Sequence, residues 1–361
     1  MSVLPHHPKS PSTGKHIRSS YWIWTCVFMV FAVLLIIYFF PEIKKDLQLL
    51  EKVEIRWLAI AICSQLLTYL FAALVYHALL KEYPAHSMPR LGELIKATVI
   101  SLFFNQTVPS GGISGNTFIF RFLKRFNIPV TDILALIIIE MLCYYAALEI
   151  LIIGSLIGFF LFVRATPHII PITLAAGIGI FLLLSIGMLM VGRKKFLAGI
   201  YRRISRIKFI REKLSGSFLQ TGIHGSVIQK QPKKHIITAI LFQLLMIFAD
   251  SFTVYALFRG LGYSIQGFIV LLAFLCTRII SILPVSPGAL ILYESSMVFF
   301  LHSLGIPLGT SIVVTLIYRL LSFWLPMPVG FILFRSEQRK YAMAYSDREE
   351  ENDASAEVAS S

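Results

Sequence analysis

Charged residues are scarce in this sequence, because only 14% of its 361 residues are Asp, Glu, Lys or Arg. A soluble domain carries roughly 25%, so this composition excludes an ordinary soluble enzyme. Hydrophobic residues make up 57% of the chain, and they come in runs of about 20, the length that crosses a bilayer core of about 30 Å. We therefore predict an all-α protein that crosses a membrane several times.

Cysteine is also rare, and its placement excludes a secreted scaffold held by disulfides. No C-x-x-C spacing occurs, and all four cysteines lie inside apolar runs, where they are expected to pack as small buried side chains. They are Cys26, Cys63, Cys143 and Cys276.

Motifs for enzymatic chemistry are missing as well. The nine histidines form no H-E-x-x-H motif and no cluster at metal-ligand spacing. There is no G-x-S-x-G nucleophile turn, and neither G-K-[ST] nor G-x-G-x-x-G marks a phosphate loop. We expect no metal and no cofactor, and we predict that the protein is not an enzyme.

The net charge of +14 could suggest a nucleic-acid partner, but the positions of the bases argue against it. Lys and Arg lie between the apolar runs, and residues 193–234 hold twelve of them against one acid, Glu212. Such a loop is typical of a cytoplasmic segment beside anionic lipid head groups. The expected partners are therefore membrane lipids and not nucleic acid.

The domain plan follows from the apolar runs. We expect a cytoplasmic leader over 1–20, one transmembrane domain over 21–335 with a basic cytoplasmic loop at 192–235, and a disordered acidic tail over 336–361. The first run has no small-residue cleavage site after it, so it is predicted to be a retained anchor. The six clear spans are Tyr21–Phe40, Trp57–Leu80, Val130–Val163, Ile169–Val191, Ile236–Phe258 and Leu308–Phe334.

Two further apolar stretches, Leu91–Val108 and Ser264–Leu283, each run into a loop rich in Pro and Gly and then into a shorter apolar stretch. A broken helix pair of this kind can enter the membrane and return to the same side, provided that protein or water surrounds the loop. We predict two re-entrant hairpins. Their loop residues include Pro109, Ser110, Gly111, Gly112, Pro287 and Gly288.

The basic residues also predict the orientation. With the amino terminus inside, the inner segments carry 25 of the 33 Lys and Arg, the outer loops carry 6, and Arg278 and Arg319 lie within the membrane. This asymmetry predicts that both termini lie in the cytoplasm. We expect the protein to reside in the inner membrane of the cell. Val130–Val163 is longer than one crossing needs, so it is either one long helix or a broken one.

An internal repeat appears when the sequence is aligned with itself so that Pro109 falls on Pro287. In this repeat alignment, without any gap, Phe122 falls on Phe300 and Gln65 falls on Gln243. In the predicted orientation the halves, about 57–163 and 236–334, run in opposite directions, which is the plan of many secondary transporters. The alternative is two unrelated Pro/Gly loops in a generic helix bundle.

Three segments carry a resemblance to a known family. They are F-F-N-Q-T-V-P-S-G-G (Phe103–Gly112), L-P-V-S-P-G-A-L-I-L-Y-E (Leu283–Glu294) and Y-R-L-L-S-F-W-L-P-M-P-V-G (Tyr318–Gly330). Together they resemble the flippase-like family built on the transmembrane region of lysylphosphatidylglycerol synthase, over about residues 20–335. Ala289 and Ile291 depart from the family pattern, in which glycines are common at these positions.

Ionisable residues at membrane depth are costly unless they are paired or hydrated, so they are the candidates for function. Glu140 and Glu149 are separated along a helix by about 180° of rotation, so they cannot both face one cavity. The others could hold a lipid head group or form buried ion pairs that lock two helices. The candidate head-group residues are Arg278, Arg319, Glu294, Asp250, Glu140 and Asn105.

These features and the resemblance lead to one functional hypothesis with two alternatives. The first is a lipid flippase or transporter-like protein for an anionic or aminoacylated phospholipid, or for a polyprenyl-linked lipid. The alternatives are a membrane-embedded transferase that modifies lipid and a non-transporting partner of a separate transferase. The sequence leaves the oligomeric state open.

Overall fold

The computed structural model describes residues 54–81, 83, 88–108, 112–162, 168–191, 232–281 and 287–339, and these residues form helices and connecting turns without strands. The predicted first span, most of the basic loop and most of the acidic tail lie outside these ranges. The helices are α2 (Ile55–Leu80), α3 (Leu91–Thr107), α4 (Ile113–Lys124), α5 (Val130–Phe162), α6 (Ile169–Val191), α11 (Lys233–Gly260), α12 (Gly267–Ile280), η3 (Pro287–Ala289), α13 (Leu292–Ser303), α14 (Leu308–Arg319) and η4 (Leu320–Trp324).

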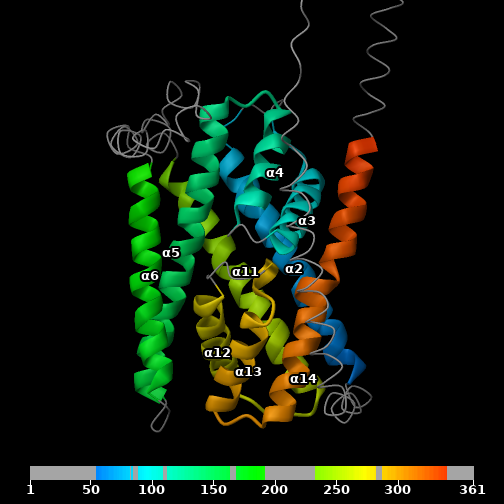
Figure 1. Cartoon of the computed structure of the whole chain (residues 1–361). Coiled ribbons are helices and arrows are strands. Elements are labelled where there is room, and N and C mark those ends of the chain that lie inside the picture. The colour runs from blue at the N-terminus through cyan, green and yellow to red at the C-terminus, as the bar shows by residue number, and fades with distance from the viewer. Residues whose placement is uncertain are drawn as a thin grey trace, which may run out of the picture. The chain divides into compact units, whose positions relative to one another are not determined.

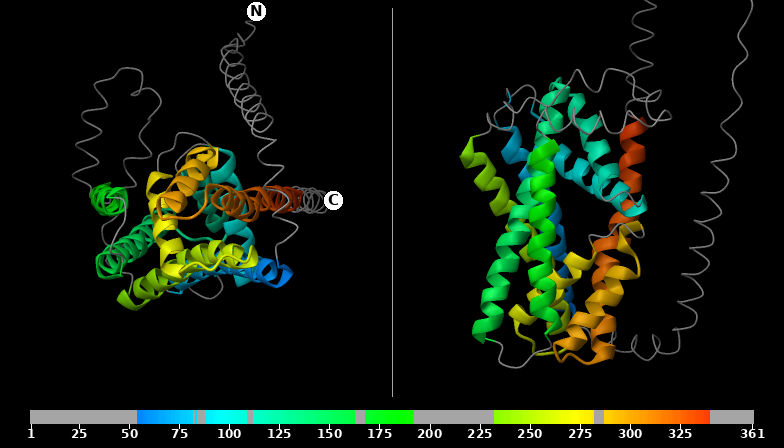
Figure 2. Two further views of the ribbon diagram at one scale, coloured as in Figure 1. Left: turned by 90° about the horizontal axis from the view of Figure 1, so that it is seen from below. Right: turned by 60° about the vertical axis from the view of Figure 1, so that its left-hand side comes forward.

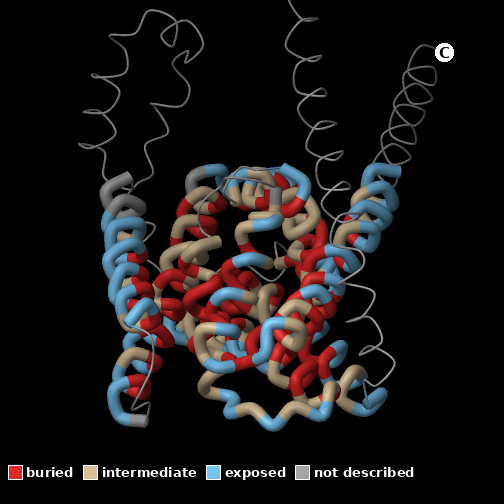
Figure 3. Tube along the Cα trace, turned by 60° about the horizontal axis from the view of Figure 1, so that its bottom comes forward, coloured by how far each residue is buried: buried red, intermediate tan, exposed pale blue. Residues whose placement is uncertain are grey.

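Five helices in the described residues are long and apolar enough to cross a membrane: α2, α5, α6, α11 and the stretch Leu308–Arg339. They coincide with five of the six predicted spans. Residues 130–162 form one continuous helix of roughly 50 Å, and the last span continues to residue 339, beyond the expected end at Phe334. Large apolar residues are exposed, with Leu183 at 72% and Phe160 at 70%, as expected for a surface that meets lipid. Figure 3 marks the exposed positions along the helices.

The most extensive helix contact in the described residues joins α2 to α11, which run antiparallel. The Glu54 N–H at the start of α2 donates to the Gly260 carbonyl at the end of α11 (2.9 Å). Farther along the pair, the Ser64 hydroxyl donates to the Ala249 carbonyl (2.7 Å). Residue numbers therefore rise along α2 while they fall along α11, and Figures 1 and 2 show the two helices side by side.

Two helical hairpins, α3–α4 and α12–α13, occupy opposite halves of Figure 1, with the first in the upper half and the second in the lower half. Each hairpin ends in a left-handed residue followed by Ile-Pro, namely Asn127 (φ 57°) before Pro129 and Gly305 (φ 90°) before Pro307. A left-handed residue ends a helix, and proline fits the start of the next one. These short signals separate α4 from α5 and α13 from α14.

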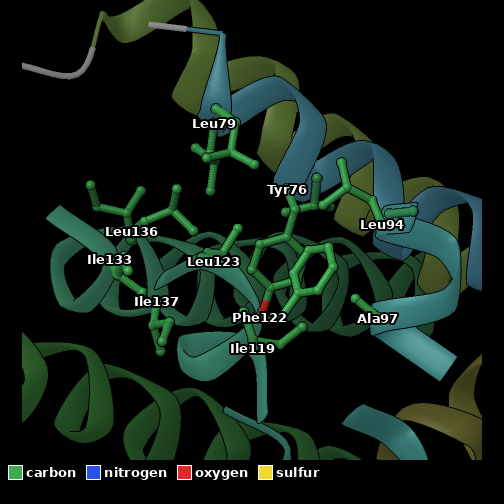
Figure 4. Close-up of a cluster of buried hydrophobic side chains, with 14 of the residues drawn as sticks. Tyr76, Leu79, Leu94, Ala97, Ile119, Phe122, Leu123, Ile133, Leu136 and Ile137 are labelled. Atoms are coloured by element: carbon green, nitrogen blue, oxygen red, sulfur yellow. The ribbon is translucent and has the colours of Figure 1, made fainter. Parts of the chain in front are cut away.

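A cluster of buried apolar side chains fixes the α3–α4 hairpin against α2 and α5. Tyr76 and Leu79 from α2 meet Leu94 from α3, Phe122 from α4 and Leu136 from α5 (Figure 4). In a bilayer such packing is driven by van der Waals contact, because lipid tails are as apolar as the side chains. The hairpin is therefore held by the shape of its contacts with the spans.

The last span contains one wide turn, η4, and proline residues follow it. The Leu325 N–H donates to the Leu320 carbonyl (2.8 Å), one residue farther back than in an α-helix. Pro326 has no N–H for the Ser322 carbonyl. The Gln106 side chain of α3 donates to this carbonyl instead (3.0 Å), and the Tyr69 hydroxyl of α2 donates to the Leu321 carbonyl (3.5 Å). Side chains from two other helices thus donate hydrogen bonds to the backbone carbonyls that the broken span leaves free directly after Arg319.

Candidate functional site

A cavity of about 520 Å³ lies inside the helix bundle, between the two hairpins and the spans. Its wall is rich in polar side chains from α2, α3, α5, α11, α12 and the last span. Buried polar surface in a membrane protein marks a candidate functional site, because lipid offers no hydrogen bonds to such groups. The polar residues that matter below are Gln65, Asn105, Gln106, Glu140, Tyr144, Gln243, Asp250, Arg278, Tyr318 and Arg319.

Arg278 at the end of α12 forms an ion pair with Asp250 of α11. The second carboxylate oxygen of Asp250 accepts a hydrogen bond from the Tyr318 hydroxyl (3.1 Å). The Arg278 side chain is still 31% exposed, although it lies over the ring of Phe274 at 5.0 Å. Both carboxylate oxygens of Asp250 are therefore engaged, whereas Arg278 lines the cavity and makes one hydrogen bond to the described residues.

Arg319 has a different environment, because it ties the α12–α13 loop to the last span. Its Nε donates to Glu294 (2.5 Å), and its Nη2 donates to the Gly288 carbonyl (3.0 Å). The guanidinium also lies between the rings of Tyr293 (4.8 Å) and Phe323 (4.3 Å). With only 8% of its side chain exposed, Arg319 acts first as a clamp on this hairpin.

The two glutamates of α5 are separated as helix geometry requires. Glu140 lines the cavity and accepts a hydrogen bond from the Gln243 amide (3.0 Å). Glu149 is not among the residues that line it. Among the described residues, Glu140 makes no ion pair with Lys, Arg or His.

Asn105 has a structural role at the tip of the first hairpin. Its Oδ1 accepts hydrogen bonds from the Gly115 N–H (2.8 Å) and the Ser114 hydroxyl (3.3 Å), so it caps the start of α4. A Cβ on Gly115 would lie 2.5 Å from this amide. The side chain that was expected to bind a head group thus also holds the two arms of the hairpin together.

The loop residues differ in what the structure describes. Pro109, Ser110 and Gly111 lie outside the described residues, whereas Gly112 has φ 93° and immediately precedes α4. Gly288 has φ 56°, and a Cβ there would lie 2.1 Å from the Phe323 ring. Ala289 (φ 53°) and Ile291 (φ 73°) also have positive φ. This conformation favours glycine, which explains why glycine fits the family pattern at these two positions.

Sequence reasoning overlooked the glutamines and tyrosines of the cavity. Gln65, Gln106 and Gln243 are buried and line it, as do Tyr144 and Tyr318. A polar residue in the middle of an apolar run is the available signal, and Gln65 and Gln243 also coincide in the repeat alignment. Among the described residues, no group of three or more His, Cys, Asp or Glu is placed to hold a metal ion.

Comparison with known proteins places this arrangement in a family. The family model for the lysylphosphatidylglycerol synthase TM region matches residues 18–330. The chain belongs to this family. It is also similar to a UPF0104 membrane protein of Pyrococcus horikoshii, with 23% identity over 327 residues that cover 83% of this chain and 93% of the relative. The resemblance noted in the three sequence segments is thereby confirmed, and the chain is a multi-pass membrane protein of this family.

Proposed function

We propose that this protein is a lipid flippase that carries an anionic phospholipid head group, or the phosphate of a polyprenyl-linked lipid, through the cavity. The observation that carries the proposal is the pair of arginines on one cavity inside a membrane bundle. A guanidinium offers five N–H donors in a planar fork that matches phosphate. Arg278 gives one of them to Asp250 and has the exposure needed to receive a ligand.

The repeat organisation supports movement of the head group. In this proposal the halves are inverted repeats with re-entrant hairpins, and transporters of that plan bind substrate at the repeat interface. In the repeat alignment the first residue of α2 coincides with the first residue of α11, and the first residue of α5 coincides with that of α14. The antiparallel contact of α2 with α11 and the packing of η3 against α3 support hairpins that meet from opposite sides.

Equivalent side chains also meet in both halves. The Asn116 amide contacts the Met141 sulfur (3.4 Å). The repeat alignment places Asn116 on Glu294 and Met141 on Arg319, and these two residues are also in contact. This shared contact supports the repeat in the proposal over two unrelated loops.

In the proposed orientation the protein lies in the inner membrane of the cell, and both of its termini are in the cytoplasm. The ion pair of Arg125 with Glu337 (3.6 Å) brings the open end of the first hairpin to the end of the last span. Both ends would therefore lie on the same side of the membrane, as the proposal requires.

The orientation is tested by labelling. Single cysteines at positions 51 and 205, in a variant without the four native cysteines, can be treated with an impermeant maleimide on intact cells. Labelling at 51 alone is expected, and labelling at 205 alone would reverse the orientation.

Lipid movement is tested with purified protein in vesicles that contain a fluorescent phosphatidylglycerol, whose outer-leaflet label is quenched by dithionite. The wild-type protein should expose the inner-leaflet label as well. Arg278→Lys keeps the charge but loses the planar fork, so it should slow the movement at least tenfold. Arg259→Lys is the matched control, because Arg259 lies over Trp57 at the far end of α11.

The same assay separates the alternatives. Folded wild-type protein that leaves the inner-leaflet label protected would contradict the flippase proposal. The lipid-modifying transferase and the non-transporting partner of a separate transferase would then be the hypotheses to test, the first by analysis of lipid products and the second by co-purification.

A further inference from the structure

The Glu140 carboxyl is the acidic group of the cavity whose charge is not balanced by a base in the described residues. Asp250 is paired with Arg278, and Glu294 is paired with Arg319. Glu140 instead accepts the neutral amide of Gln243 at 3.0 Å. The described charges of the site therefore add up to one negative charge when Glu140 is ionised and to zero when it is protonated.

The described groups that interact with Glu140 are neutral. They are the Tyr76 hydroxyl of α2 and the Gln243 amide of α11, together with Cys143, Tyr144 and Tyr145 on α5 itself. Two charged groups of the cavity, Arg278 and Asp250, interact with the Tyr144 hydroxyl, which also interacts with Glu140. Burial of an ionised carboxyl without a counter-charge at this depth is energetically costly, and protonation removes that cost.

Gln243 can form a hydrogen bond with Glu140 whether the carboxyl is ionised or protonated. Its Nε2 donates to Glu140 Oε1 in the present arrangement, and its Oε1 is buried without a hydrogen-bond partner in the described structure. An amide carries both donors and an acceptor, so turning it over would let Oε1 accept the O–H of a protonated Glu140. A lysine in its place would stabilise only the ionised form.

We infer that Glu140 takes up one proton with each anionic head group that enters the cavity, and this inference rests on the proposed function. An anion at Arg278 makes a second negative charge in the cavity more costly, so it favours the protonated carboxyl. Linkage is reciprocal, and protonation of Glu140 therefore strengthens anion binding. The step adds a proton from the aqueous phase to a carboxylate and releases it on the other side.

The test uses the same vesicles and fluorescent phosphatidylglycerol, with equal pH on both sides. Occupancy of a single proton site falls about tenfold for each pH unit on the alkaline side of its titration. Wild-type lipid movement should therefore slow by up to tenfold per unit as the pH rises from 6 to 8. Glu140→Gln, which mimics the protonated state, should move lipid at a rate that no longer depends on pH.

Glu149→Gln is the matched control, because it makes the same change on the same helix outside the cavity; it should keep the wild-type pH profile. A second measurement needs no variant. A pH dye enclosed in wild-type vesicles should report acidification when phosphatidylglycerol is supplied to the outer leaflet, and no such signal when phosphatidylcholine is supplied.

The outcomes separate this inference from the proposed function. Wild-type protein that moves no lipid at any pH contradicts the flippase proposal itself. Lipid movement with the same rate at pH 6 and 8, or a Glu140→Gln variant that keeps the wild-type profile, overturns only the proton site. A rate that increases with pH would also overturn it, because protonation of Glu140 would then hinder the movement of the anionic lipid.

Discussion

The two hairpins have the same layout but are held by different chemistry. At the tip of α3–α4 the contacts are neutral, with Asn105 accepting hydrogen bonds from Ser114 and Gly115. At the tip of α12–α13 the clamp is charged, with Arg319 bound to Glu294 and to the Gly288 carbonyl. The first half shows that the tip of such a hairpin can be held by neutral hydrogen bonds.

The difference is clearest at two pairs of residues that occupy equivalent positions in the repeat alignment. Asn116 with Met141 fills the place in the first half that Glu294 with Arg319 fills in the second. Buried ion pairs are weak evidence for stability, because desolvation offsets much of the attraction between the charges. The neutral pair in the first half is therefore a natural comparison for the charged pair in the second half.

The largest effect is expected when one partner of the charged clamp is removed. Arg319→Met leaves Glu294 without a counter-charge and should lower the free energy of unfolding by about 3–5 kcal/mol. The double variant Glu294→Asn/Arg319→Met copies the neutral pair of the first half and should recover most of that loss. Unfolding in mixed detergent and SDS measures both. Equal instability of the single and double variants would refute the equivalence of the two pairs.

The next effect concerns the close approach of the last span to the α3–α4 hairpin. A Cβ on Gly330 would lie 2.5 Å from Phe103 Cβ and 3.1 Å from the Val99 carbonyl oxygen. Gly330→Ala should cost about 1–3 kcal/mol through overpacking, measured by the same unfolding assay. Gly154→Ala in α5, where no atom lies within 4 Å of the added Cβ, should be nearly neutral. Similar losses for the two variants would contradict the expected packing.

The third effect concerns the hydrogen bond by which the first hairpin supports the broken span. Its loss should lower the free energy of unfolding by about 1–3 kcal/mol, the cost of a buried carbonyl left unpaired. Gln106→Leu removes the donor to Ser322. In a Pro326→Ala background the backbone N–H of residue 326 can bond that carbonyl, so the same change should cost less. A double-mutant cycle on unfolding free energies tests this coupling, and strict additivity would argue against it.

The smallest effect is expected at the neutral clamp. Asn105→Ala removes the cap of α4 and should lower the free energy of unfolding by about 1 kcal/mol, well below the value for Arg319→Met. Asn116→Ala, which removes the contact with Met141 but leaves the cap in place, provides a comparison within the hairpin. A loss at Asn105 as large as that at Arg319 would show that the two hairpins do not differ in the way described above.

The sequence by itself determined the spans and the breaks between them. Apolar runs predict crossing helices because length and composition are local properties, and five of the runs are helices of spanning length. The Pro/Gly segments predict the ends of α3 and α12 for the same reason, since proline and glycine act on the backbone at their own positions. The intramembrane ions could also be named from the sequence, because any charge in an apolar run is unusual.

Only the tertiary structure decided which of these residues meet. Arg278 pairs with Asp250, 28 positions away, and Arg319 pairs with Glu294, 25 positions away, because the packing of separate helices sets the distances. The wide turn and Pro326 leave the Ser322 carbonyl without its usual helical donor. Gln106, 216 positions away in the chain, donates to it instead, and only the packing of α3 decides whether this side chain can reach it. Local sequence fixes where a helix starts and stops, but its rotation and neighbours depend on contacts that no single segment contains.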